Sequence, residues 1–330
     1  MRRRADSAGA AGFVTSGVRR TLRVRERAEH GATRAACIPP RMTRIAHISD
    51  LHLVERAHAT RRGLSDVRLR YLSFGRPIDF AARVARAREA LRLALAARPD
   101  HLCITGDLTE DGTPAQFAVL AEVLHDAGVS PERTTLVPGN HDGYDDPRAF
   151  ETALAGPLAP FRETSTPGSV VVHDGAAVVA VSTLIPQSFA RSAGAVDRAQ
   201  LTHLALLAED AWLRTRALVV AQHHPPMRHL APGLQWLDGL ERPEPLRGLV
   251  ERHAHMHVLH GHTHAAADRA VGRGRDAQVF CVPAAVDTDE PVRVYEATEQ
   301  RLRPLCGPAA RPVQSRERRR PTLPSLAASA

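Results

Sequence analysis

Short apolar runs that stop at polar loops recur along the chain from Arg44 onward. The runs at 45–48, 101–105 and 134–137 predict buried strands, because strands covered on both faces read as continuous apolar segments. A helix is predicted over about 78–97, since its apolar residues recur three and four apart, as one helical face requires. This alternation of strand and helix predicts a layered α/β fold.

The second half of the chain continues the same alternation with more strands. The further elements that we expect are helices over about 114–127, 197–209 and 245–254, and strands over 170–173, 177–182, 217–222, 257–260, 277–283 and 291–297. The first two of these strands flank Asp174-Gly175, a pair that is favoured in tight hairpin turns.

Five of the predicted strands end in loops that carry Asp, Asn or His. These loops are Asp50-Leu51-His52, Gly106-Asp107, Gly139-Asn140-His141-Asp142, His223-His224 and Gly261-His262-Thr263-His264. Ligand sites in layered α/β folds gather at the carboxyl ends of strands, so we expect the five loops to converge on one point.

The spacing within these loops suits metal binding. Residues two apart on an extended segment point the same way, so both side chains of D-x-H, and both of H-x-H, can reach one ion. The Gly before Asp107, Asn140 and His262 is expected to let the chain turn sharply where the strand ends. Carboxylate, amide and imidazole together suit Mn, Fe or Zn better than calcium or copper. Two ions that share one bridging carboxylate would account for the whole set.

The motifs GDLTEDG, PGNHD, HHPP and GHTH follow the D-x-H loop in the order found in the calcineurin-like metallophosphoesterase superfamily. Over about 44–297 the chain resembles the bacterial cyclic-nucleotide phosphodiesterase-like branch of that superfamily. The resemblance implies an α/β fold, a four-layer αββα sandwich of two mixed β-sheets flanked by helices. It also implies two divalent or mixed-valence metal ions (Mn, Fe or Zn).

The resemblance assigns a role to each matching residue. The first ion would be held by Asp50, His52 and His264, the second by Asn140, His223 and His262, and Asp107 would bridge the two. The catalytic residues would be His141, which assists the leaving group, and Asp142, which orients His141.

The implied activity is dinuclear-metal-dependent hydrolysis of a phosphate ester, with a metal-bridging hydroxide as the nucleophile. A small-molecule phosphodiesterase is favoured. The alternatives are a phosphomonoesterase, a protein phosphatase and a non-catalytic scaffold of the same fold. The Arg of the GDxVDRG wording typical of protein phosphatases is missing from 106–112, and the intact ligand set with His141 disfavours a scaffold.

Several assignments stay open at this level. His223 is favoured over His224 as the ligand, because it directly follows the strand. His260 is expected to be a buried, hydrogen-bonded residue and not a ligand. The polar segment 55–77 is expected to be a solvated loop, with a lid over the site as the alternative. Six of its residues are alternatively phosphate ligands, namely Arg56, Arg61, Arg62, Arg68, Arg70 and Arg76.

The net charge of +8 belongs to the two ends of the chain. All 44 basic residues are Arg. Ten of them lie in 1–41 against three acidic residues, and five lie in 307–330 against one, which leaves 42–306 at −3. A nucleic-acid-binding domain carries its positive charge on the folded surface, so no specific nucleic-acid partner is expected. We expect 1–41 to be a disordered extension or a mis-assigned start, and 307–330 to be a disordered tail.

Cysteine usage and hydropathy narrow the cellular setting. The four Cys residues form no C-x-x-C pair, which indicates reduced thiols and a cytoplasmic location. No apolar run reaches the 18 or so residues that a membrane helix needs, so no membrane partner is expected. The expected partner is a small phosphate ester, and the oligomeric state is open, with a homodimer among the alternatives.

Overall fold

The computed structural model describes residues 42–272, 274 and 276–305. The predictions for 1–41 and 307–330 lie outside the described residues, as do Cys37 and Cys306. The two described cysteines, Cys103 and Cys281, are free and buried.

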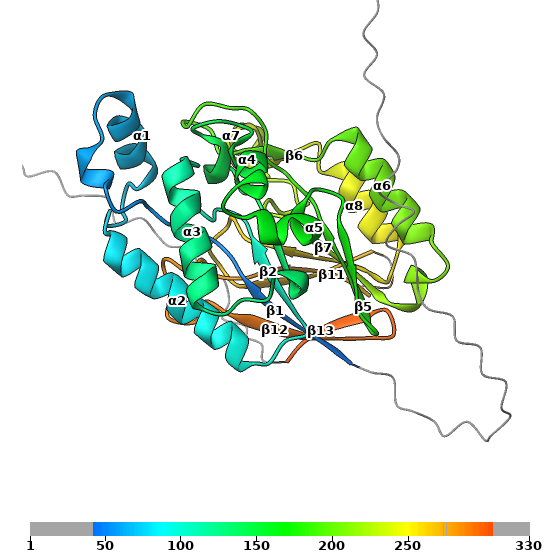
Figure 1. The fold of residues 1–330 in the computed structure, drawn as a ribbon. Helices are drawn as coiled ribbons and strands as arrows, with labels where there is room; N and C mark the ends of the chain where they lie inside the picture. Colours follow the sequence, from blue (N-terminus) through cyan, green and yellow to red (C-terminus); the bar gives the residue numbers. More distant parts are fainter. Residues whose placement is uncertain (1–41, 273, 275, 306–330) are drawn as a thin grey trace, which may run out of the picture. The chain divides into compact units, whose positions relative to one another are not determined.

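Two mixed β-sheets form the centre of the fold (Figure 1). The first contains, in spatial order, β13 (Arg301–Pro304), β12 (Arg293–Thr298), β1 (Thr43–Ile48), β2 (His101–Thr105) and β3 (Thr134–Val137). The second contains β10 (Ala267–Val271), β11 (Ala277–Cys281), β9 (Met256–His260), β7 (Ala217–Ala221), β5 (Ala176–Ala180) and β4 (Val170–Val172). A third, two-stranded sheet pairs β6 (Gly194–Ala195) with β8 (Leu240–Glu241).

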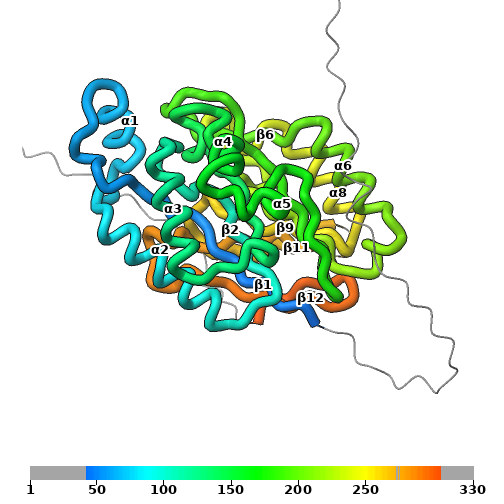
Figure 2. Tube along the Cα trace, in the orientation of Figure 1, coloured from blue at the N-terminus to red at the C-terminus, as the bar shows by residue number. Residues whose placement is uncertain are grey.

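The parallel strands set the position of the site. β1, β2 and β3 run parallel, and so do β5, β7, β9 and β11. The carboxyl ends of each set therefore lie at one edge of its sheet, where the five predicted loops begin. The described chain starts in β1 and ends in β13, and β12 lies between these two strands (Figure 2).

Helices cover the outer faces of both sheets. The helices are α1 (Leu64–Leu72), α2 (Phe80–Ala96), α3 (Pro114–Asp126), α4 (Ala149–Ala155), α5 (Arg162–Ser165), α6 (Arg198–Glu209), α7 (Pro232–Asp238) and α8 (Glu244–Arg252). One apolar cluster joins α2, α3 and α4 to the first sheet, a second joins α6 and α8 to the second sheet, and a third lies between the sheets. This is the four-layer αββα sandwich that the resemblance implies, and that prediction is confirmed.

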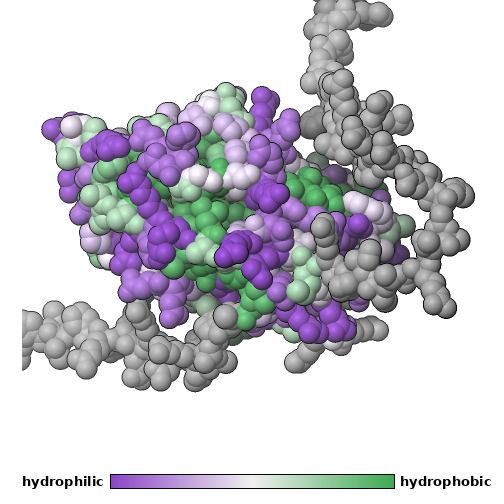
Figure 3. Space-filling view, turned by 60° about the horizontal axis from the view of Figure 1, so that its bottom comes forward, coloured by the Kyte–Doolittle hydropathy of each residue, from purple (hydrophilic) through white to green (hydrophobic). Residues whose placement is uncertain are grey.

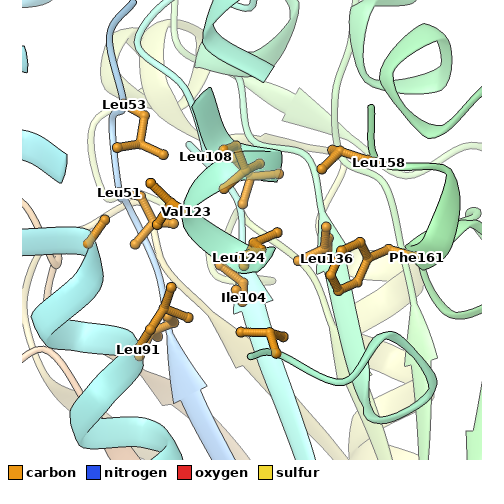
Figure 4. Close-up of a cluster of buried hydrophobic side chains, with 14 of the residues drawn as sticks. Leu51, Leu53, Leu91, Ile104, Leu108, Val123, Leu124, Leu136, Leu158 and Phe161 are labelled. Atoms are coloured by element: carbon orange, nitrogen blue, oxygen red, sulfur yellow. The ribbon is translucent and has the colours of Figure 1, made fainter. Parts of the chain in front are cut away.

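The first of these clusters fixes the helices to the strands that carry the site. Leu91 of α2 and Leu124 of α3 pack over Ile104 of β2 and Leu136 of β3 (Figure 4). Burying each such side chain stabilises the fold by about 1.5–3 kcal/mol. The strand ends are therefore held rigidly beneath the polar loops.

The surface in Figure 3 is mixed in polarity. The face that Figure 3 brings forward interleaves hydrophilic and apolar residues, as expected when more than half of a protein's accessible surface is apolar. Within the described ranges, no helix combines the length and apolarity that crossing a bilayer requires.

The segment 55–77 differs from the predicted solvated loop. It contains α1, and two of its arginines are largely buried: the side chains of Arg61 and Arg68 are 7% and 11% exposed. Both donate to the fully buried carboxylate of Asp111, with N···O distances of 2.7–2.9 Å. Arg56, Arg62 and Arg70 are exposed. The sequence could not show this arrangement, because the shared partner Asp111 lies more than 40 residues further along the chain.

Replacing Asp111 with Ala should lower the free energy of unfolding by about 3 kcal/mol, because two buried guanidinium groups lose a charged acceptor. Asp66→Ala is the matched control: Asp66 pairs with the exposed Arg70 four residues along α1, and such exposed pairs contribute little to stability. Urea unfolding of both variants measures the difference. Equal losses in the two variants would show that the Asp111 network does not hold this segment.

Candidate metal centre

The loops after β1, β2, β3, β7 and β9 meet at one place. Asp107 Oδ2 lies 3.2 Å from His223 Nε2 and 3.7 Å from His52 Nε2. Asp50 Oδ1 lies 3.3 Å from His264 Nε2. Three groups of potential ligands result, each with its ligand atoms within 4.8 Å of one another: Asp50, His52 and His264; Asp50, Asp107 and His223; and His52, Glu110 and His141.

Five of the seven predicted metal ligands have a left-handed backbone. Their φ angles are 58° at Asp50, 48° at His52, 46° at Asp107, 68° at His262 and 54° at His264. Residues other than Gly rarely adopt such angles, and each costs on the order of 1–3 kcal/mol, which is typical of functional sites. The prediction of extended D-x-H and H-x-H segments is therefore wrong. Ligand and apolar residues nevertheless alternate along the first loop. Leu51, between Asp50 and His52, and Leu53, directly after His52, are both buried in the core.

The glycines before the ligands serve close packing more than turning. Only Gly106 has a positive φ, of 90°. A side chain at Gly139 would overlap the carboxylate of Asp107, and one at Gly261 would overlap Ser49 and Asp50. Glycine is needed at these two positions because site side chains lie directly against the backbone.

Carboxylates orient the two histidines predicted for the first ion. His264 Nδ1 lies 2.7 Å from Asp287 Oδ2, and His52 Nδ1 lies 3.2 Å from Glu110 Oε2. The contact with Asp287 leaves His264 Nε2 for an ion, whereas Nε2 of His52 lies 3.2 Å from Arg76 Nη1, which an ion at this nitrogen would have to displace. Metal-binding histidines in proteins almost always have such a partner on the other nitrogen.

Hydrogen bonds distinguish His223 from His224. His223 Nδ1 donates to the carbonyl of Thr105 at 2.8 Å, and its Nε2 is buried without a hydrogen-bond partner. Both nitrogens of His224 are engaged, with Thr183 Oγ1 at 2.7 Å and the Ser192 carbonyl at 2.9 Å. The geometry therefore favours His223 as the ligand, and it leaves His224 no nitrogen for a phosphate.

The other two residues predicted for the second ion are also held through one atom. Asn140 Nδ2 donates to Tyr144 Oη at 2.9 Å, which leaves Oδ1 as the free ligand atom. His262 Nε2 donates to the carbonyl of Asp238 at 2.8 Å, which leaves Nδ1. His262 is outside the three ligand groups, and its ring centroid lies 5.1 Å from that of His223.

The site has the properties of a cation site. Asp50 Oδ1, Asn140 Oδ1 and His223 Nε2 are buried without hydrogen-bond partners, an arrangement that costs free energy unless another group satisfies them. Burial opposes protonation of His223, but the charge of Asp107 outweighs it and raises the pKa of His223 to about 9. The pKa of His264 rises to about 10 against the same burial effect, because Asp287 and Asp50 stabilise its charge. Positive charge is thus favoured where mixed O and N ligands converge, which fits transition-metal ions.

The two predicted catalytic residues have separate surroundings. His141 Nδ1 donates to the carbonyl of Glu110 at 2.6 Å, and its Nε2 lies 4.0 Å from Asp107 Oδ2. Asp142 does not contact this ring through any of its hydrogen bonds: its carboxylate accepts from the amides of Leu108, Thr109 and Gly139. The carbonyl of Glu110 therefore orients His141, whereas Asp142 ties the loops after β2 and β3 together.

Two further residues complete the site: Arg76, which the sequence left open as a phosphate ligand, and Glu110, which the sequence did not single out. The guanidinium of Arg76 reaches it, with Nη1 3.2 Å from His52 Nε2. Glu110 is buried and pairs with both Arg76 and Arg83. His260 is buried, with Nδ1 donating to the carbonyl of Gly261 at 2.8 Å, as predicted.

The chain is similar to known metallophosphoesterases. The calcineurin-like phosphoesterase family model matches residues 43–266. A probable cyclic nucleotide phosphodiesterase of Rhodococcus erythropolis is 29% identical over 231 residues, which cover 67% of this chain and 64% of that protein. The cAMP/cGMP dual specificity phosphodiesterase of Mycobacterium tuberculosis is 28% identical over 224 residues, 67% of this chain and 61% of that protein. The chain thus spans less than two thirds of the length of either relative.

A solved structure agrees at the level of the fold. The dimetal phosphatase from Danio rerio superimposes with a TM-score of 0.55 at 14% identity, covering 78% of this chain and 93% of that one. The match to the family model, together with the cluster of Asp and His side chains, places the chain among the metallophosphoesterases. More specifically, the chain belongs to the calcineurin-like phosphoesterase family.

Proposed function

We propose that this enzyme hydrolyses small phosphodiesters at a dinuclear centre. Asp50, His52 and His264 would hold the first ion, Asn140, His223 and His262 the second, with Asp107 shared between them. The observation that carries the proposal is the set of buried, unpaired ligand atoms at the ends of parallel strands. When bound, two such ions lower the pKa of coordinated water towards about 7 and neutralise charge on the phosphoryl oxygens.

The protein's own residues would complete the chemistry. His141 offers Nε2 beside Asp107, because its Nδ1 is fixed on a carbonyl. In the imidazolium form Nε2 also carries a proton, so His141 would donate that proton to the departing oxygen and be left as the neutral imidazole. Arg76 adds a fixed positive charge next to His52 and would bind the substrate's phosphoryl group.

Phosphodiesters are favoured over monoesters because the relatives named above are called cyclic nucleotide phosphodiesterases. The test is turnover of cyclic AMP, cyclic GMP, an aryl phosphodiester and an aryl phosphomonoester with added Mn²⁺. We expect chelator-sensitive hydrolysis that is faster for the diesters. Asp107→Asn protein, purified identically, controls for contaminating phosphatases. Faster monoester hydrolysis would favour the phosphomonoesterase alternative, and inactivity on all four would refute the proposal.

A further inference from the structure

The residues proposed for the two ions are held by different parts of the chain. His52 and His264, proposed for the first ion, contact Glu110 and Asp287, respectively. Asn140 and His262, proposed for the second ion, rest instead on Tyr144 and Asp238. The two positions therefore have separate supports.

Tyr144 determines which way the amide of Asn140 faces. Its hydroxyl accepts from Asn140 Nδ2 at 2.9 Å and donates to the carbonyl of Arg191 at 2.7 Å. The hydroxyl has a single proton, which it donates to the carbonyl of Arg191, so it can only accept a hydrogen bond from Asn140. This fixes the amide nitrogen on Tyr144 and leaves the oxygen, the only amide atom that can bind a cation, facing the site.

Arg191 and Asp238 belong to one small unit, which we call the β6–β8 unit (residues 191–195 and 236–241). Arg191 Nε donates to the carbonyl of Trp236 at 2.8 Å, and Ser192 Oγ donates to Asp238 Oδ1 at 2.6 Å. The strand pairing of β6 with β8 joins the same two segments. This unit is not part of either large sheet.

We propose that Tyr144 and Asp238 are positioning residues through which the β6–β8 unit sets the affinity for the second ion alone. The proposal rests on the ligand assignment of the proposed function. Removing support from a metal ligand typically weakens metal binding by about 10- to 100-fold. A change in the β6–β8 unit would therefore lower occupancy of one ion while the other stays bound.

Titrating chelator-treated protein with Mn²⁺ by calorimetry, without substrate, tests this directly. The variant Tyr144→Phe should weaken one of two binding events by about 10- to 100-fold and leave the other unchanged. The matched control is Tyr71→Phe. Tyr71 also contacts the segment before β6, through its ring against Phe189 at 5.4 Å, but no ligand rests on it. Tyr71→Phe should bind both ions like the unmodified protein.

Double variants identify the ion that is affected. In a His264→Ala background, where the second event remains, adding Tyr144→Phe should weaken that event. In an Asn140→Ala background, where the first event remains, the same addition should change nothing. Unchanged binding in the first background, or weakened binding in the second, would overturn the proposal. A parent protein that binds fewer than two ions would instead refute the dinuclear centre itself, so the two failures are distinguishable.

Discussion

Asp107→Asn should abolish turnover, with a loss on the order of 10³-fold or more, because both ions would lose the ligand that they share. Asp107 lies within 4 Å of three ring nitrogens, from His52, His141 and His223. Asn keeps the shape of the side chain and tolerates a left-handed backbone. The amide oxygen can still accept from the backbone N–H of His141, as Asp107 Oδ1 now does at 3.0 Å. The effect therefore isolates the lost charge.

The measurement pairs turnover with metal content by mass spectrometry. We expect fewer than two ions per chain and no chelator-sensitive activity. Asp126→Asn is the control, since Asp126 forms only exposed ion pairs on the surface, and it should retain both activity and metal. Two tightly bound ions together with normal rates in Asp107→Asn would show that the Asp107 carboxylate is not needed to hold the ions.

His141→Ala should leave the metal content intact and lower kcat by about 10²-fold or more, as expected when a general acid is removed. The loss should depend on the leaving group. An alkoxide needs a proton as it departs, whereas a nitrophenolate is stable without one. We therefore expect a large loss with a cyclic nucleotide and a much smaller one with a nitrophenyl ester.

This dependence separates proton donation from a structural role, which would slow both substrates alike. His125→Ala is the matched control, because the side chain of His125 is 91% exposed on the surface. An equal loss on both substrates, or a loss of metal in His141→Ala, would contradict the role of His141 as a proton donor.

Much of the frame could be predicted because buried parallel strands leave a strong signal. The observed β2 and β3 match the predicted ranges residue for residue, since each is an apolar run between helix-breaking or turn residues. Helix α1 was not predicted for the opposite reason. Its apolar residues Leu64, Val67 and Tyr71 face solvent, and the buried Arg68 reads as a surface residue. Burial that depends on distant carboxylates leaves no local pattern.

The site shows the same division. The motifs and their order along the chain predicted that six site residues lie together, because each follows a strand: Asp50, His52, Asp107, Asn140, His223 and His264. The supporting residues could not be found in this way. Glu110 lies inside a quoted motif without a distinguishing spacing, and Asp287 and Tyr144 are ordinary polar residues in loops. Only their hydrogen bonds show which ring nitrogen or amide atom they fix.

The position of β1 has a consequence for how the protein is made. It pairs with β2, which lies about 50 residues further along the chain, and with β12, which lies about 250 residues further along than β1. Pairings of such long sequence separation slow folding, because the loop must close before the contacts form. A nascent chain therefore displays every loop of the metal centre before β12 leaves the ribosome, with one edge of β1 still unpaired. Such an edge can pair with another chain, so until β12 is made the partly synthesised protein has an edge at which it can aggregate.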